Sequence, residues 1–414
     1  MSNDYSGKPL GIITGGHSGF QYGRAIKRLH HKREVPVIAF CGCGDDGGSS
    51  RYFRNFGLLP PGDYWKLIMG ASCYKGGIYD HLSNLLFYRF DHDGPLKKRQ
   101  VKELVRIAAD ERGIEGCKGA LKVIYDILSP DYRFEFGEDS GEGSQTKGHT
   151  LGNLILAALM LKHGNVAGIR LLEEGLDSAV YCVPVSESPY TLHITTIDEN
   201  SLTGEHRLDE DEIISPIYNV THSKNGGGKV DVNPEVLSTL SNLRRLSLCA
   251  TSMVANLWGM MLPEIRDHIQ RSSFPLDFWI NLMTEQNQTH YVINGCVVRL
   301  DLTQHVALAT KITGCVPDVV VAHDYGIYAP KRRRIPNYVQ ERYARKHATP
   351  VQCTDQDEII LKSTFDQPPY NKVPMLLRRS LAIVDTDIDR GQKVIRHDPE
   401  RIERIFEELL RMQI

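Results

Sequence analysis

Two short polar loops carry the residues best suited to chemistry in this 414-residue chain. The glycine loop is Thr14-Gly15-Gly16-His17-Ser18-Gly19, and the acid loop is Gly44-Asp45-Asp46-Gly47-Gly48-Ser49-Ser50. Bare glycines let a diphosphate approach the backbone, where N–H groups at a helix start can face it. Paired acids can hold a ribose hydroxyl or a divalent cation. Together the loops predict a site for a nucleotide diphosphate and Mg²⁺.

Neither loop matches a standard phosphate or nucleophile motif. The spacing G-x-G-x-x-G is absent, and so is the Walker pattern ending in Gly-Lys-Ser/Thr. Ser18 is not in a nucleophile elbow, because Phe20 stands where that motif needs glycine. Taken alone, the glycine loop is also compatible with a tight turn that binds nothing. The acid loop that follows it favours a binding site.

Two further residues have both a structural and a functional interpretation. Asp63 precedes a helical pattern, so it is either a helix N-cap or a third acid that holds Mg²⁺ with Asp45 and Asp46. His149 lies just before Thr150, the expected N-cap of a buried helix. A loop hydrogen bond and a catalytic role are both open for His149.

The order of apolar runs and helical patterns predicts the architecture that must position these residues. Apolar runs at 10–13 and 35–41 flank a helical segment, and strand patterns return after position 243. We therefore expect an α/β fold, a Rossmann-like doubly wound and mainly parallel sheet. The core domain spans 1–330, with a helical lid insertion at 91–147 and a β extension at 181–230. A C-terminal extension, 331–414, packs on it and ends in a helix capped by Asp398.

Composition excludes several classes of protein. Lys and Arg number 49 against 51 Asp and Glu, a formal net charge of −2, so a nucleic-acid backbone is not the expected partner. Nine scattered cysteines argue against a disulfide framework. No apolar stretch reaches membrane-spanning length and the first residues do not form a signal peptide. We expect a cytoplasmic protein without membrane contact, with a homodimer as the default assembly.

Several blocks in sequence, taken together, resemble one known superfamily. It is that of 2-phospho-L-lactate transferase (CofD) and the YvcK-type gluconeogenesis factor, and the chain is more similar to the YvcK-like branch. The similarity covers about positions 9 to 325 and rests on the two loops above and on four further blocks. These are 57–63 (GLLPPGD), 148–154 (GHTLGNL), 263–266 (PEIR) and 281–284 (NLMT).

The resemblance implies a nucleotide-binding α/β protein with one of two functions. In the transferase branch a phospholactyl-type group moves from a guanosine-diphosphate-activated donor to a deazaflavin alcohol, with Mg²⁺ and release of GMP. In the YvcK-like branch the pocket binds UDP-sugars, and the protein regulates carbon flow and cell-envelope synthesis.

Carried over to this sequence, the resemblance assigns roles to individual positions. Asp45, Asp46 and Asp63 are the expected metal ligands, and Asp46 and His149 the catalytic candidates. The expected nucleotide-binding residues are Gly15, Gly16, His17, Ser18, Gly19, Gly47, Gly48, Ser49, Ser50, Arg54, Asn153, Thr251 and Asn281.

Three departures from the family pattern fall inside the expected site. His17-Ser18 stands where Gly-Thr is usual, and Arg51 follows Ser50 where a glycine is usual, so either Arg51 or Arg54 could face phosphate. The later Gly-Pro-Gly-Ser loop is replaced by residues 249–253 (CATSM), without glycine. That loop forms the nucleotide's second wall, so the base and sugar stay open.

Overall fold

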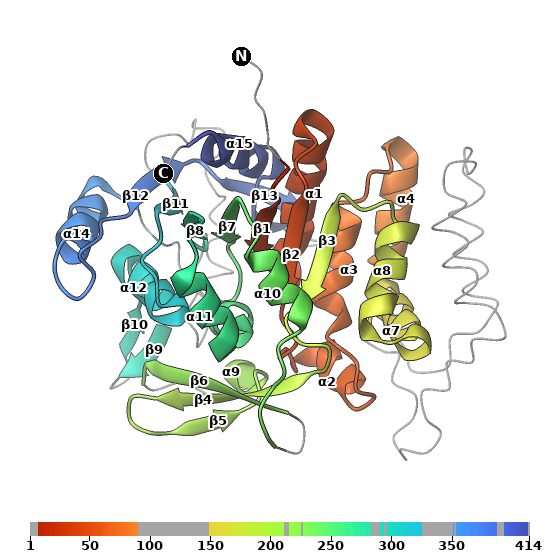
Figure 1. Ribbon diagram of the computed structural model, residues 1–414, viewed down its shortest axis with the longest axis horizontal. Helices are drawn as coiled ribbons and strands as arrows, with labels where there is room; N and C mark the ends of the chain where they lie inside the picture. The colour runs from red at the N-terminus through yellow and green to blue at the C-terminus, as the bar shows by residue number, and fades with distance from the viewer. Residues whose placement is uncertain are drawn as a thin grey trace.

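A seven-stranded parallel sheet forms the centre of the part of the chain described by this computed structural model (Figure 1). The described residues are 7–89, 149–210, 215–224, 227–282, 290–293, 296–324, 351, 353–386 and 393–412. The strand order is β12-β11-β8-β7-β1-β2-β3. The strands are β1 (Leu10–Ile13), β2 (Val37–Cys41), β3 (Val180–Pro184), β7 (Arg245–Leu248), β8 (Leu276–Trp279), β11 (Val319–His323) and β12 (Met375–Arg379).

The inner strands are buried because both faces of the sheet are covered. Arg245 of β7 and Asp277 of β8 are buried with them as an ion pair. β1, β7, β8 and β11 are buried along their whole length. From β1 the chain builds the sheet in one direction through β2 and β3, and from β7 in the other through β8, β11 and β12. The order therefore reverses between β1 and β7. This confirms the predicted Rossmann-like α/β fold and marks the crevice where such sheets bind ligands.

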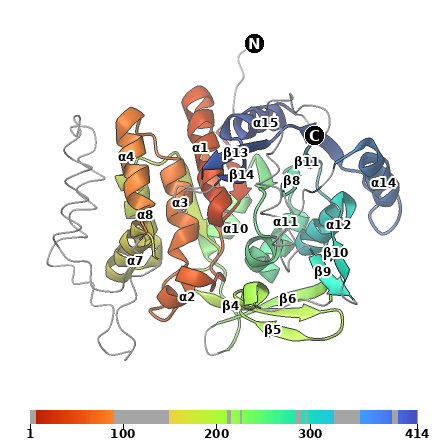
Figure 2. The ribbon, with the colours of Figure 1, turned by 180° about the vertical axis from the view of Figure 1, so that it is seen from behind.

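Helices cover both faces of the sheet, as the front and back views show (Figures 1 and 2). The site involves α1, α2, α3 and α7 together with a π-helix, η3, that follows β7. The described helices are α1 (Gly16–Arg33), α2 (Gly48–Arg54), α3 (Pro61–Gly70), α4 (Gly76–Leu86), α7 (Leu151–His163), α8 (Asn165–Gly175), α9 (Arg207–Glu210), α10 (Pro234–Leu240), η3 (Met253–Trp258), α11 (Pro263–Arg271), α12 (Leu302–Thr313), α14 (Asp355–Phe365) and α15 (Pro399–Arg411).

A small antiparallel sheet lies beyond the carboxyl ends of the central strands, at the bottom of Figure 1. It consists of β4 (Tyr190–Thr196), β5 (Ser201–Thr203) and β6 (Ile217–Lys224), in the order β5-β4-β6. The predicted β extension began at position 181, but β3 pairs with β2 and is the edge strand of the main sheet. We call the β4–β6 sheet and its connections, up to Lys224, the extension.

The C-terminal segment is partly built into the core. β12 pairs in parallel with β11 and so extends the main sheet by one strand. The capping of α15 is confirmed, because the side chain of Asp398 accepts a hydrogen bond from Glu400 N–H at 2.9 Å. Two short antiparallel ribbons complete the described strands: β9 (His290–Ile293) with β10 (Cys296–Arg299), and β13 (Ala382–Thr386) with β14 (Lys393–His397).

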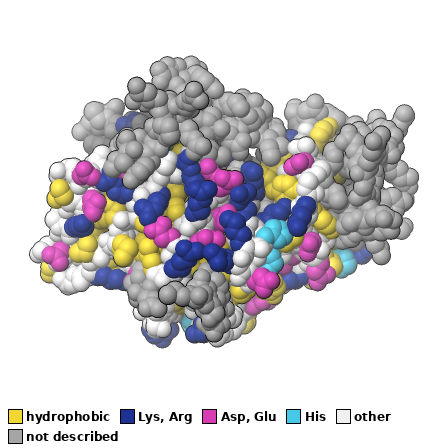
Figure 3. Space-filling model, turned by 90° about the horizontal axis from the view of Figure 1, so that it is seen from above, with side chains coloured by type: hydrophobic (Ala, Val, Ile, Leu, Met, Phe, Trp, Pro, Cys, Tyr) yellow, Lys and Arg dark blue, Asp and Glu magenta, His cyan; other side chains and the backbone are white. Residues whose placement is uncertain are grey.

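α15 packs along α1 through charged side chains. Glu403 is buried and pairs with Arg28, whose Nε lies 3.1 Å from Glu403 Oε2, and with Lys32. Figure 3, the view from above, shows Lys and Arg side chains interspersed with Asp and Glu side chains on this face. Arg28, Lys32 and Arg33 of α1 are therefore partnered by the C-terminal helix.

Two expectations fall on other parts of the chain. The predicted lid insertion, 91–147, lies outside the described residues. Among those that are described, no helix is long and apolar enough to cross a membrane.

Candidate functional site

The glycine loop joins β1 to α1 and is held by a distant carboxylate. Gly16 adopts a left-handed backbone conformation, with φ of +58°, and its N–H donates a hydrogen bond to Asp63 Oδ1 at 2.6 Å. Ser18 Oγ donates to the carbonyl of Gly15 at 2.8 Å. The predicted N-cap role of Asp63 is wrong: the N-cap of α3 is Pro60, and Asp63 lies in the first turn. Its side chain is directed to the neighbouring loop because the amide of Gly16 offers it a donor.

The pKa of Asp63 indicates that the acid loop lies close to it. The pKa of Asp63 is raised to about 7, chiefly by burial and also by the negative charge of Asp45. The hydrogen bond from Gly16 N–H acts in the opposite direction, because it favours the ionised form. One buried carboxylate therefore touches the glycine loop and is repelled by the acid loop. The two loops, separated by a helix and a strand in sequence, converge on Asp63.

Asp45 organises the acid loop from within. Its Oδ1 accepts a hydrogen bond from Gly47 N–H at 2.9 Å, and its Oδ2 accepts one from Ser50 Oγ at 2.8 Å. Gly47 is the N-cap of α2 and Gly48 its first residue. The Asp45 side chain is only partly buried, so it remains accessible while it fixes this turn.

Asp46 faces a different part of the molecule. Its Oδ1 accepts a hydrogen bond from the backbone N–H of His206 at 2.8 Å, and its Oδ2 lies 3.6 Å from Arg54 Nη1. Arg54 is buried and donates to the carbonyl of Gly44 at 3.2 Å and to Thr191 Oγ1 at 3.1 Å. Arg51, the other arginine considered for phosphate, is exposed.

A chain of amide groups lies at the point where the strand order reverses. The buried side chain of Asn256, in η3, donates to Thr251 Oγ1 at 2.9 Å. Asn281 Nδ2 donates to the carbonyl of Thr251, also at 2.9 Å. A Cβ atom on Gly15 would stand 2.8 Å from Asn256 Oδ1, so the glycine loop and Asn256 are in close contact. These groups lie beside the glycine loop, in the segment where the family pattern has its later glycine loop.

Two site residues were not predicted from the sequence. Asn256 is a polar amide inside an otherwise apolar run, 253–261, which is a signal for a buried hydrogen-bonded role. His206 lies in the turn that begins at Gly204, which has φ of +93°. Its contact with Asp46 joins residues 160 positions apart, so no local pattern in the sequence could predict it.

The start of α7 packs against α2. The predicted N-cap is confirmed, with Thr150 Oγ1 accepting from Asn153 N–H at 3.3 Å. His149 is buried and its ring centroid lies 4.9 Å from that of Phe53. The pKa of His149 is lowered to about 4, chiefly by burial and also by the charge of Arg89, so the ring is neutral at pH 7. Asn153 Oδ1 accepts a bond from Trp65 Nε1 at 2.6 Å, which joins α7 to α3.

Most of the expected binding residues thus gather around the carboxyl ends of β1, β2 and β7. Gly19 faces away from them, because its Cα points to α3, where an added Cβ would lie 3.5 Å from Leu67 Cβ. The side chains of His17 and Ser49 are outside the described part of the structure.

Three carboxylates, those of Asp45, Asp46 and Asp63, were expected to hold the metal. Within the described residues, no three His, Cys, Asp or Glu side chains form a group that could hold a metal by themselves. Mg²⁺ is commonly bound by one or two carboxylates, with phosphate oxygens and water as the other ligands. Asp45 and Asp63, two like charges close enough to shift a pKa, fit that smaller requirement.

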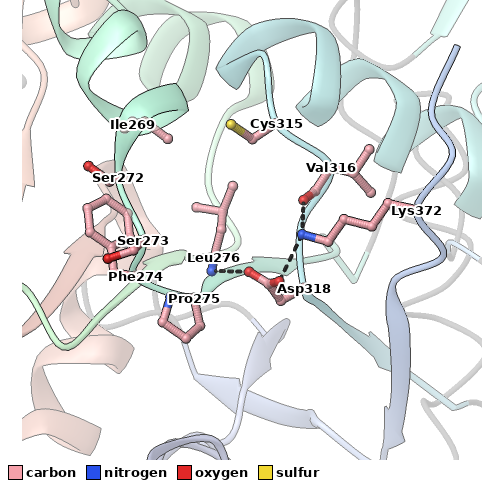
Figure 4. A pocket seen from close by; sticks show the side chains of 10 residues that line it. All are labelled: Ile269, Ser272, Ser273, Phe274, Pro275, Leu276, Cys315, Val316, Asp318 and Lys372. Carbon is pink, nitrogen blue, oxygen red and sulfur yellow. Dashed lines mark hydrogen bonds and ion pairs between the residues drawn. The ribbon is translucent and has the colours of Figure 1, made fainter. Parts of the chain in front are cut away.

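A separate cavity of about 180 Å³ opens at the amino ends of β8 and β11, on the opposite edge of the sheet (Figure 4). Lys372 Nζ lies on one side of it and donates to Asp318 Oδ1 at 2.8 Å and to the carbonyl of Val316 at 3.1 Å. Asp318 Oδ2 accepts from Leu276 N–H at 2.7 Å. These polar groups form hydrogen bonds with one another. Because the cavity lies at the amino ends of the strands, it is distinct from the site at their carboxyl ends.

Comparison with known proteins supports the fold described above. Two crystal structures of one Bacillus halodurans protein, described as a member of the UPF0052 family, match with TM-scores of 0.66 and 0.65. For the first the identity is 19%, and the match covers 97% of this chain and 99% of the other. The second is also 19% identical, with 96% of this chain and 98% of the other covered. At this identity the likeness shows a shared fold.

Sequence relatives carry one name. A gluconeogenesis factor from Listeria monocytogenes is 23% identical over 312 residues, 72% of this chain and 74% of that protein. A Lactococcus lactis protein provisionally named a gluconeogenesis factor is also 23% identical over 312 residues, 74% of this chain and 77% of its own length. The family model for 2-phospho-L-lactate transferase CofD matches residues 11–364. The chain therefore belongs to the CofD family, with YvcK-like gluconeogenesis factors among its relatives.

Proposed function

We propose that this protein binds a nucleoside-diphosphate-activated donor at the carboxyl edge of β1 and β2 and, with Mg²⁺, transfers its terminal phosphorus-containing group to an acceptor hydroxyl. The acceptor oxygen forms the new bond to phosphorus, the bond between the two phosphates breaks, a nucleoside monophosphate leaves, and the hydroxyl proton passes to a base. One observation carries the proposal. Asp63 accepts a hydrogen bond from Gly16 N–H at 2.6 Å while the charge of Asp45 raises its pKa. The glycine loop and the acid loop therefore flank one point, where a diphosphate and its cation can be held together.

Each part has a defined task in such a reaction. The amides of the glycine loop and the start of α1 place the diphosphate, because a helix N-terminus favours negative charge. Asp45 and Asp63 are the residues that would hold Mg²⁺, which neutralises phosphate charge when bound. Binding of the cation also relieves the repulsion between these two carboxylates. Transfer of a phosphoryl-type group depends chiefly on such positioning and charge neutralisation.

The base that would accept the proton of the acceptor hydroxyl is less well supported. His149 is neutral at pH 7, but with a pKa of about 4 it is a weak base, and it packs behind α2. Asp46 is buried against His206 and Arg54. The catalytic roles of both residues stay predictions.

A second function is supported by the relatives. Their shared name, gluconeogenesis factor, favours a role in carbon metabolism. The resemblance to the YvcK-like branch implies a regulator that binds a UDP-sugar, in this case without turning it over. The same two loops would hold a UDP-sugar through its diphosphate. Cleavage of the diphosphate separates the two functions: the transferase breaks it and releases a nucleoside monophosphate, whereas the regulator leaves the bound ligand intact.

Identification of the bound nucleotide separates them experimentally. The purified protein is analysed by native mass spectrometry, and GDP and UDP-glucose are then titrated by calorimetry with and without Mg²⁺. A retained guanosine nucleotide and tighter GDP binding support the transferase, whereas a retained UDP-sugar supports the regulator.

The double variant Asp45→Asn/Asp46→Asn provides the control for the site itself. We expect it to abolish Mg²⁺-dependent nucleotide binding while its circular dichroism spectrum stays that of the wild type. Equal affinity of the two proteins, with and without the metal, would show that the acid loop does not bind the cation.

A further inference from the structure

The turn Gly204-Glu205-His206, between β5 and α9, lies directly against the acid loop. The backbone N–H of His206 donates to Asp46 Oδ1 at 2.8 Å, and the ring Nδ1 of His206 lies 3.2 Å from the same oxygen. The approach is close on the other side of the turn as well. A Cβ on Gly47 would stand 2.8 Å from Glu205 Oε2.

Gly204 makes this approach possible. It adopts φ of +93°, and a Cβ at this position would stand 2.6 Å from both Asp46 Oδ2 and the ring of His206. Side chains rarely adopt this backbone conformation, and the space for one is already filled. The turn therefore needs glycine both for its shape and for its distance from Asp46.

Arg54 ties the same loop to the extension from a second direction. Its guanidinium bridges the carbonyl of Gly44, at the start of the acid loop, and Thr191 Oγ1 on β4. It also lies 3.6 Å from Asp46 Oδ2. The acid loop is thus held between the extension and its own helix α2.

The two acids of the loop differ in what surrounds them. Asp46 is buried, with its oxygens against His206 and Arg54, whereas Asp45 is partly exposed and bonds only within its own turn in the described contacts. A carboxylate whose oxygens are used by the extension is poorly placed to coordinate a cation as well. A partly exposed one is better placed.

We propose that the extension positions the acid loop of the nucleotide site, and that Asp46 is a positioning residue that acts through the Gly204–His206 turn. Asp45 and Asp63 are then the acids that face Mg²⁺ and the diphosphate. This inference rests on the proposed function, which did not assign a role to the extension.

Gly204→Ala and Gly227→Ala form a matched pair for the test. Gly204 follows β5 and Gly227 follows β6, and both have φ of +93°. Gly227 has no atom within 4 Å of an added Cβ. The two variants therefore share the backbone strain and differ in the contact with Asp46. Folding of each is checked by circular dichroism and thermal melting.

The first measurement needs no ligand: hydrogen exchange of the amides at 44–50 in the free protein. We expect Gly204→Ala to speed exchange there at least about tenfold, and Gly227→Ala to leave it unchanged. The second is GDP affinity with Mg²⁺, which should fall at least about tenfold in Gly204→Ala alone. Equal behaviour of the two variants in either measurement would overturn the inference.

Asp46 provides a second pair that does not depend on the turn's backbone. Asp46→Asn keeps an oxygen that can accept from His206 N–H, whereas Asp46→Ala does not. A positioning role predicts that Asn restores most of the slow exchange and most of the GDP affinity lost in Ala. Equal loss in both variants would instead identify Asp46 as a metal ligand.

The ligand-free arm separates this inference from the proposed function. If the wild-type protein binds neither GDP nor UDP-glucose, the proposed function fails, and the site role of the extension fails with it. If the wild type binds but exchange at 44–50 does not respond to Gly204→Ala, only the positioning role fails.

Discussion

Helix α1 contacts a buried carboxylate near each end, and the two carboxylates have different charged neighbours. At its C-terminal half, Glu403 is neutralised by Arg28 and Lys32. At its N-terminus, Asp63 accepts a hydrogen bond from Gly16 N–H and lies near two charges, Asp45 of the same sign and Lys66 of the opposite sign. Burial and the charge of Asp45 outweigh Lys66 and Gly16, so the pKa of Asp63 stays raised. A buried carboxylate costs free energy unless it is paired. Glu403 is paired by the fold itself, whereas Asp63 is incompletely compensated.

The difference indicates what each end is for. In the C-terminal half of α1, Arg28, Lys32 and Arg33 form ion pairs with α15, so this half holds α15 in place. The N-terminal end keeps a helix dipole, bare backbone and two adjacent acids together, an arrangement that a bound cation and a phosphate would complete. The comparison predicts that removing a charge destabilises the fold at one end and stabilises it at the other.

The largest expected effect on stability is that of Glu403→Gln. It removes a buried charge from two cations, and because these are about half exposed we expect a loss of about 2 kcal/mol in the free energy of unfolding. Glu400→Gln is the control, since Glu400 pairs with the same Arg28 but is exposed, and should cost under about 1 kcal/mol. Urea denaturation measures both, and equal losses would contradict the assignment.

Asp63→Asn should have the opposite sign in the absence of ligand. The amide oxygen can still accept from Gly16 N–H, while the buried charge is gone, so we expect a gain of about 1 kcal/mol at pH 8. The gain should shrink toward pH 5. With a folded pKa of about 7 against about 3.9 unfolded, wild-type stability falls as pH rises through this window. A loss of stability at pH 8 would contradict the account.

His149 should give a smaller pH dependence of the reverse sign. Its folded pKa of about 4 lies below the unfolded value of about 6.5, so the unfolded chain binds more protons between these values. We expect the wild type to lose about 1 kcal/mol relative to His149→Phe as pH falls from 6.5 to 4. His163→Ala, at the exposed end of α7, serves as the control in thermal melting. Parallel pH profiles for wild type and His149→Phe would refute this interpretation.

The smallest effect is expected for Gly19→Ala. The new methyl group meets Leu67 at an ordinary contact distance inside a helix, so the variant should gain about 0.5 kcal/mol in unfolding free energy. The same urea assay measures it. A large loss of stability would mean that α1 and α3 pack more closely than the structure shows.

Local patterns in the sequence were sufficient for the central elements. Apolar runs located β1 and β11, and capping residues located the starts of α7 and α15. These signals depend on neighbours within a few residues, so a single sequence contains them. Asp63 shows the limit of such signals. Its position before a helix suggested a cap, but its side chain accepts a hydrogen bond from Gly16 N–H, 47 positions away.

The rest of the site depends on contacts between distant segments. The pairing of β3 with β2, and of β12 with β11, decides which strands belong to the main sheet. The contact of His206 with Asp46 and that of Asn256 with Gly15 likewise arise only on folding. No periodicity or spacing encodes such pairs. The sequence therefore predicted the two loops but not the groups that hold them.

Hydrogen exchange of the full chain with GDP and Mg²⁺ tests the central claim most directly. If the glycine loop and the acid loop grip one diphosphate, exchange should slow at 14–19 and at 44–50 together, and only when both GDP and Mg²⁺ are present. Slower exchange in one loop alone, or in neither while calorimetry shows GDP bound, would contradict a shared site.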